Sequence, residues 1–156
     1  MNREQMLSLF QQHRKAEAAR NFDAIMATFA DDCYLETVPL NLRIEGQGPA
    51  RTAYEGYFRA FPDLSPDDQG FAFGDDAVVT WGTLRGTSKG DWFGVPGSGH
   101  SFIVPFVNLA RFRADRMAGE SIYFDLATLC DQAGLSIDKI RAAAQIRAQA
   151  VQGTGR

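Results

Sequence analysis

The chain has 156 residues, of which 45% are hydrophobic and 22% are charged. This length fits one domain with its own hydrophobic core, which we place at residues 1–152, followed by a disordered tail at 153–156. The net charge of -3 argues against a nucleic-acid partner, because binding to phosphates needs clustered Lys and Arg. No window approaches the roughly 18 apolar residues of a membrane span, so we expect no membrane partner either.

The cysteine and histidine content gives no sign of a metal site. Cys33 and Cys130 are the two cysteines of the sequence, and no cluster has the spacing of metal ligands. The first residues, Met1 to Leu9, lack the apolar run of a signal peptide. We therefore expect a cytoplasmic protein with reduced thiols.

Apolar residues at helical spacing dominate the first part of the chain. They predict a helix over Met6–Arg20, a second over Asn21–Ala30 and a third over Pro49–Phe61. Between the last two helices, Cys33–Val38 and Leu42–Glu45 are rich in β-type residues and predict a short strand pair. The third helix begins at Pro49, a residue that is favoured at the first helical position.

The middle of the chain has the pattern of an antiparallel meander. Its predicted strands are Phe71–Phe73, Ala77–Leu84, Ser101–Phe112 and Met117–Phe124. Two helices follow Asp125, and Ser136 caps the second. This order predicts an α+β domain with helices on one face of an antiparallel sheet, and a strongly curved sheet of this kind leaves a pocket between the layers.

Three segments carry a family resemblance: GDWFGVPGSGHSF at Gly90–Phe102, YFDLATLCDQAG at Tyr123–Gly134, and DAIMATFADDCYLE at Asp23–Glu36. They resemble the SnoaL-like polyketide cyclases, a branch of the nuclear transport factor 2-like superfamily. The resemblance implies a cone-shaped curved sheet with the N-terminal helices packed in its concave face, enclosing a pocket, plus C-terminal helices. It also implies an enzyme without cofactor or metal that closes a ring by intramolecular aldol condensation of a small apolar molecule.

The resemblance assigns the general acid/base role to Asp125. A buried carboxyl with a raised pKa can remove a proton from an acidic carbon and return one to a developing alkoxide. Asp125 also stands where an aspartate would cap the helix that follows. Capping favours the ionised carboxylate, whereas burial in an apolar pocket favours the neutral acid.

Two polar residues on apolar faces are candidates for substrate binding. Asn108 shares its strand parity with a series of apolar residues, and it replaces a polar, His-type residue of the cyclases. His13 lies on the apolar side of the first helix, where related ketosteroid isomerases carry a tyrosine. Thr37 stands where those isomerases have their base, and a threonine cannot take an α-proton at neutral pH. Both candidates also have a purely structural interpretation as satisfied core residues.

The remaining candidate binding residues are one loop histidine and a set of aromatic residues. His100 follows a glycine-rich loop and could lie at the mouth of the pocket or be exposed. The candidate pocket walls are Tyr54, Tyr57, Trp81, Trp92 and Tyr123.

Two other interpretations stay open. The protein could bind a small hydrophobic ligand or act as a dimeric scaffold without turnover, because this fold hosts both classes. A limonene-type epoxide hydrolase ranks last, because the strands offer no Asp-Arg-Asp arrangement. The strand Ala77–Leu84 is apolar on both parities, which predicts a homodimer or higher homo-oligomer formed through the outer sheet face.

Overall fold

The computed structural model describes residues 1–153, with side chains up to residue 150. The tail predicted at 153–156 therefore lies, apart from its first residue, outside the described residues. In chain order the elements are α1 (Arg3–Ala18), α2 (Phe22–Thr28), β1 (Phe29–Thr37), a 3-10 turn (Val38–Leu40), β2 (Leu42–Glu45), α3 (Gln47–Ala60), β3 (Ser65–Phe73), β4 (Ala77–Thr87), β5 (Ser101–Arg113), β6 (Arg116–Phe124), α4 (Leu126–Ala133) and α5 (Ile137–Gly153).

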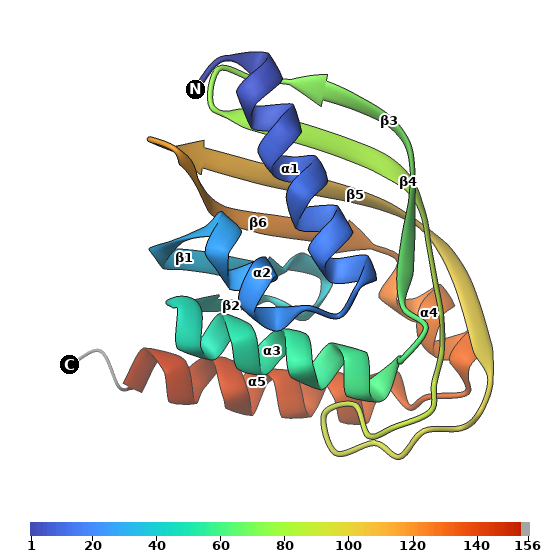
Figure 1. Cartoon of the computed structure of the whole chain (residues 1–156). Helices are drawn as coiled ribbons and strands as arrows, with labels where there is room; N and C mark the ends of the chain where they lie inside the picture. Colours follow the sequence, from blue (N-terminus) through green and yellow to red (C-terminus); the bar gives the residue numbers. More distant parts are fainter. Residues whose placement is uncertain (154–156) are drawn as a thin grey trace.

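The six strands form one curled sheet in the order β2-β1-β6-β5-β4-β3. Helices α1, α2 and α3 pack on one face of this sheet, and α5 packs against β2 (Figure 1). The α+β architecture agrees with the prediction from the sequence. One detail differs, because β1 and β6 pair in parallel, whereas the other neighbours are antiparallel.

Side-chain capping explains where the helices begin. The Asn21 side chain accepts a hydrogen bond from the Ala24 N–H at 3.0 Å and fixes the start of α2. Asn2 and Gln5 form a reciprocal capping box at the start of α1. Gly134 ends α4 in the left-handed conformation, at φ 63°, which glycine adopts without strain.

Strict alternation along β5 decides which residues face the helices. Its buried and exposed residues alternate over most of the strand, so that Phe102, Phe106 and Asn108 point into the concave face. Strand β3 is longer than predicted, because it begins at Ser65. Pro66 obscured this start in the sequence, and it is tolerated because β3 is an edge strand.

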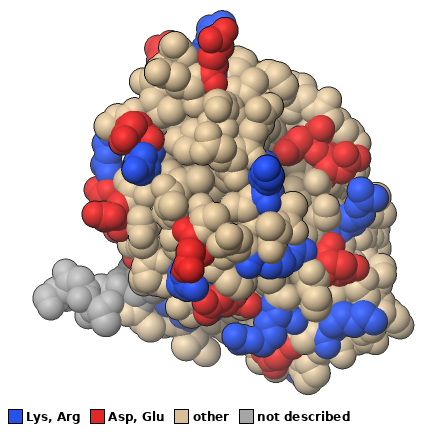
Figure 2. Space-filling model, in the orientation of Figure 1, with Lys and Arg blue, Asp and Glu red and all other residues tan. Residues whose placement is uncertain are grey.

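The surface carries charges of both signs. Figure 2 shows Lys and Arg interspersed with Asp and Glu on the face that it presents, in keeping with the small net charge of -3. No helix within residues 1–153 has the length and apolar character needed to span a membrane.

Candidate functional site

A cavity of about 220 Å³ lies between the concave face of the sheet and helices α1 and α3. Most of its wall is apolar. The apolar and aromatic lining residues are Leu35, Tyr54, Tyr57, Phe58, Phe61, Leu64, Leu84, Trp92, Phe102, Phe106, Ile122, Phe124 and Leu129. An enclosure of this kind binds apolar molecules and excludes most of the water around any charged group in its wall.

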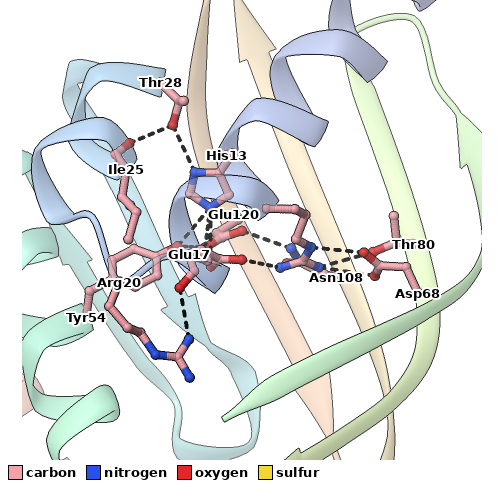
Figure 3. A network of polar contacts seen from close by, with 11 residues as sticks. His13, Glu17, Arg20, Ile25, Thr28, Tyr54, Asp68, Thr80, Asn108 and Glu120 are labelled. Atoms are coloured by element: carbon pink, nitrogen blue, oxygen red, sulfur yellow. Dashed lines mark hydrogen bonds and ion pairs between the residues drawn. The ribbon is translucent and has the colours of Figure 1, made fainter. Parts of the chain in front are cut away.

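The charged residues that line the cavity are Arg14, Glu17, Arg20, Glu36, Asp68 and Glu120. Four of them lie together at one end: Arg14 and Glu17 from α1, Asp68 from β3, and Glu120 from β6. Asn108 of β5 lies beside them and His13 of α1 completes the cluster, which the dashed lines of Figure 3 connect. The cavity therefore has one end at which charges and hydrogen-bond donors converge on an otherwise apolar space.

Glu120 is the carboxylate at the centre of this polar end. Its Oε1 accepts a short hydrogen bond from the Tyr54 hydroxyl, and its Oε2 accepts one from the Asn108 side-chain amide at 2.9 Å. The side chain of Glu120 keeps only 12% of its surface exposed. Each carboxylate oxygen has two lone pairs, so these two donors orient Glu120 and leave acceptor capacity for a ligand.

The hydrogen bonds of His13 fix its protonation state. Thr28 gives its only hydroxyl hydrogen to the Ile25 carbonyl at 2.6 Å, so Thr28 accepts from His13 Nδ1 at 2.9 Å. Tyr54 gives its hydroxyl hydrogen to Glu120, so it accepts from His13 Nε2 at 3.1 Å. Both ring nitrogens are therefore donors, which makes His13 a buried imidazolium.

The charges around His13 account for this state. Burial of the ring lowers the pKa of His13, but the carboxylates of Glu17 and Glu120 outweigh burial and raise it above its ordinary value. Glu17 Oε1 lies 3.3 Å from His13 Nε2. Burial acts to raise the pKa of Glu17, but the opposite charges of Arg14 and His13 hold it far below its usual range.

Arg14 is fully engaged within the site. Its guanidinium binds Glu17 Oε2 at 2.9 Å and forms two hydrogen bonds with Asp68, at 3.1 and 3.3 Å. Arg14 therefore joins α1 to the edge strand β3 across the end of the cavity. Because two carboxylates pair with it, Arg14 offers little free positive charge to a ligand.

The donor atoms of His13, Glu17 and Glu120 lie within 4.8 Å of one another, a separation that a metal ion could bridge. However, the hydrogen bonds of Thr28 and Tyr54 already require a hydrogen on each ring nitrogen of His13. A metal ligand needs the lone pair of a neutral imidazole. This arrangement of hydrogen bonds fits a proton at Nε2 and does not fit a metal ion.

Residues 8–133 match the family profile of the SnoaL-like polyketide cyclases, which covers most of the chain. The chain belongs to the SnoaL-like polyketide cyclase family. A search of the curated proteins finds no match. The family assignment confirms the resemblance of the three sequence segments.

Solved structures share the fold of this SnoaL-like protein. A proposed SnoaL-like polyketide cyclase from Jannaschia sp. CCS1 superposes with a TM-score of 0.77 at 21% identity, covering 85% of this chain and 94% of the other. A proposed polyketide cyclase from Xanthomonas campestris pv. campestris gives a TM-score of 0.77 at 17% identity, covering 85% and 99%. A protein with a ketosteroid isomerase-like fold from Catenulispora acidiphila gives 0.72 at 18% identity, covering 83% and 95%. At these identities the similarity shows the fold alone.

The expected placement of Asp125 in the pocket is wrong for this SnoaL-like protein. Asp125 is exposed at the start of α4, where it accepts hydrogen bonds from the Thr128 N–H at 3.0 Å and the Thr128 hydroxyl at 2.6 Å. These hydrogen bonds lower the pKa of Asp125, whereas a buried general acid needs a raised one. The structure assigns Asp125 to helix capping, which was the second interpretation of this residue.

The other predicted site residues separate into two groups. Tyr54, Tyr57, Trp92 and Asn108 line the cavity as expected. His13 is fully buried and does not line the cavity, so its expected contact with a substrate is wrong; its ring instead donates a hydrogen bond to the lining residue Tyr54. The other three residues lie outside the cavity, and their expected placement at the pocket is wrong: His100, Trp81 and Tyr123.

The reasons for these three corrections are local. Trp81 and Tyr123 have the strand parity of the outer sheet face, where they are 43% and 44% exposed. His100 is exposed and lies next to Gly134 at the end of α4. The residue therefore packs against a helix end and does not reach the cavity.

The charged residues at the polar end of the cavity were not singled out from the sequence: Arg14, Glu17, Asp68 and Glu120. Glu17 follows His13 by four positions, which places both on one helix face. Glu120 shares strand parity with Ile122 and Phe124, which also line the cavity. The sequence therefore contained one signal for Glu120: an acidic residue on the same face of the strand as two apolar residues.

Proposed function

We propose that this protein is an enzyme that transfers protons to and from a small apolar, oxygenated molecule, with Glu120 as the general base and acid. The reaction class is intramolecular aldol condensation or a related isomerase or lyase reaction. One observation carries the proposal: Glu120 is a carboxylate held by two donors in the wall of a mainly apolar cavity. Membership of the SnoaL-like family supports the reaction class.

The proposed reaction needs one group that handles a proton twice. Glu120 removes a proton from the carbon next to a ligand carbonyl, and the resulting enolate carbon attacks a second carbonyl of the same molecule. The new alkoxide then takes the proton back from Glu120, so that the carboxylate is restored. The apolar wall supports this step, because it limits the access of water to the reacting groups.

Tyr54 and Asn108 are positioning residues in this proposal. Their hydrogen bonds fix the plane of the Glu120 carboxylate. The side-chain carbonyl of Asn108 is buried and has no hydrogen-bond partner among residues 1–150. Such an orphan acceptor is rare in native proteins, and a ligand hydroxyl or a water would satisfy it.

A hydrogen-exchange assay tests the proposal without knowledge of the natural substrate. The protein is incubated in heavy water with small aryl ketones such as 1-tetralone, and loss of the α-proton signal is followed by NMR. We expect the protein to accelerate exchange and Glu120→Gln to lower the rate by about 10²–10⁴-fold, the usual contribution of a general base. Equal rates for the two proteins would overturn the role of Glu120.

A ligand-binding protein without turnover is the second candidate. The observation in its favour is that Arg14, Glu17 and His13 already satisfy one another inside the protein. Such a protein would bind the aryl ketones and leave their α-protons unexchanged. The same NMR experiment therefore separates the two candidates.

We also propose that the functional unit is a homodimer formed through the outer sheet face. Trp81, Val107 and Tyr123 lie in register across β4, β5 and β6, and they are 43%, 39% and 44% exposed. Ile103, on the same face of β5, is 55% exposed. A second copy of the chain would remove this apolar surface from water.

A further inference from the structure

A second cavity of about 220 Å³ lies on the other side of the wall of the first. It is formed by β1, β2, α3, the segment around Trp92 and one residue of α5. Four residues line both cavities, which makes them the partition: Leu35, Thr37, Tyr57 and Trp92. The Tyr57 and Thr37 hydroxyls close part of this partition with a hydrogen bond of 2.7 Å.

The two cavities differ in the positive charge that they offer. In the first cavity, Arg14 is bound by two carboxylates, and Arg20 donates to the carbonyls of residues 17, 62 and 64. The second cavity is lined by Arg59 and Arg147. Neither forms an ion pair with a carboxylate of residues 1–150. Both guanidinium groups are therefore exposed at the second cavity without a carboxylate partner, and that of Arg147 lies 5.9 Å from the centre of the Phe93 ring.

A further observation indicates a missing acceptor at this wall. The indole N–H of Trp92 is buried and has no hydrogen-bond partner among residues 1–150. The one acidic lining residue, Asp91, uses its Oδ1 to accept the Gly94 N–H at 2.8 Å.

We infer that the second cavity is an anion subsite that binds the carboxylate of an extended ligand, whose apolar body passes the partition into the first cavity. Arg59 and Arg147 pair with the carboxylate, which also accepts the hydrogen of the Trp92 N–H, and Tyr57 contacts the chain between the two ends. Arginine suits this role because its planar guanidinium binds carboxylates through two parallel hydrogen bonds. The inference deepens the proposed function and rests on it for the role of the first cavity.

Binding of straight-chain probes tests the subsite. Trp81 and Trp92 are the two tryptophans of the sequence, so in a Trp81→Phe background the intrinsic fluorescence reports on Trp92 at the partition. Alkanoates of 8 to 14 carbons and the matching 1-alkanols are titrated while this fluorescence is followed, and calorimetry gives the dissociation constants. The comparison isolates the carboxylate, because each pair of probes shares its apolar chain.

We expect the best alkanoate to bind at least about tenfold more tightly than the alkanol of the same length and to change the Trp92 emission. A hydrogen bond to a charged group contributes about 1.5–3 kcal/mol, and about 1.4 kcal/mol corresponds to a tenfold difference in affinity. Arg59→Gln combined with Arg147→Gln should abolish this preference and leave alkanol binding unchanged. Arg141→Gln is the matched control. Arg141 is exposed on α5, the helix that carries Arg147, and it does not line the second cavity.

Two outcomes would overturn the subsite: equal affinities of alkanoate and alkanol for the unmodified protein, or an equal loss of alkanoate affinity in Arg141→Gln. Glu120→Gln separates this inference from the proposed function. That variant should keep the carboxylate preference, because Glu120 does not line the second cavity, even where ketone exchange is lost. If Glu120→Gln loses ketone exchange but still prefers alkanoates to alkanols, the result supports both the role of Glu120 and the anion subsite.

Discussion

Tyr54 of α3 donates its hydroxyl hydrogen to Glu120 of β6 and accepts one from His13 of α1 at 3.1 Å. One phenol thus connects two helices with the sheet at the polar end of the cavity. Burial raises the pKa of Tyr54 well above its ordinary value, and the carboxylates of Glu120 and Glu17 act in the same direction. The hydroxyl therefore stays protonated at neutral pH and keeps donating to Glu120.

Replacing Tyr54 by Phe removes one of the two hydrogen bonds that orient Glu120. A hydrogen bond to a charged group contributes about 1.5–3 kcal/mol, so we expect the rate of ketone exchange to fall roughly 10- to 100-fold. Tyr34→Phe is the matched control, because it also loses a phenolic hydroxyl and Tyr34 lines neither cavity. If both variants exchanged ketones at the same rate, Tyr54 would have no special role in positioning the carboxylate.

The buried imidazolium of His13 predicts a pH dependence of stability. A raised pKa in the folded state gives stability that is complete below the ordinary value of 6.5 and is lost as the pH rises through the folded-state pKa. The lowered pKa of Glu17 gives stability that is complete above its ordinary value of 4.5 and is lost only in strong acid. The pair is therefore most stabilising between pH 4.5 and 6.5.

Urea unfolding between pH 5 and 9 measures this effect. Above pH 6.5 the free energy of unfolding should fall by up to about 1.4 kcal/mol per pH unit. His13→Gln should remove this slope, because glutamine does not titrate. His100→Gln is the control, because His100 is the other histidine of the sequence and is exposed. This variant should keep the pH dependence of the free energy of unfolding. An unchanged slope in His13→Gln would show that His13 does not carry the buried charge.

The apolar row of the outer face predicts the oligomeric state. We expect the protein to be a dimer by light scattering, and Trp81→Lys combined with Val107→Lys to shift it to the monomer, because two buried lysines in each copy cannot be paired. Ile146→Lys is the control, since Ile146 is 69% exposed on α5 and is not part of the outer sheet face. A monomeric unmodified protein would contradict the proposed interface.

Periodicity and capping residues predicted most of the fold. The helical face around His13, the caps Asn21 and Asp125, and the alternation that turns Asn108 inward all follow from local rules. The parallel pairing of β1 with β6 could not be predicted in this way, because it joins strands far apart in the chain. No local pattern specifies such a partner.

The candidate site was only partly predictable, and the reason is a bulge in β6. Met117 is fully buried, and regular alternation from it would turn Glu120 outward. The register shifts opposite Arg111 and Phe112, which reverses the parity and brings Glu120 to the concave face. The placement of Asp125 was also wrong, because the sequence does not show whether the junction between β6 and α4 faces the cavity or the solvent.

The rates of ketone exchange by Glu120→Gln and Asp125→Asn, measured side by side, test the central claim most directly. Asparagine can still cap α4, so Asp125→Asn should fold normally and exchange α-protons at the rate of the unmodified protein. Glu120→Gln should keep the fold and lose about 10²–10⁴-fold in rate. The opposite result, with Glu120→Gln active and Asp125→Asn inactive, would contradict the assignment of proton transfer to Glu120.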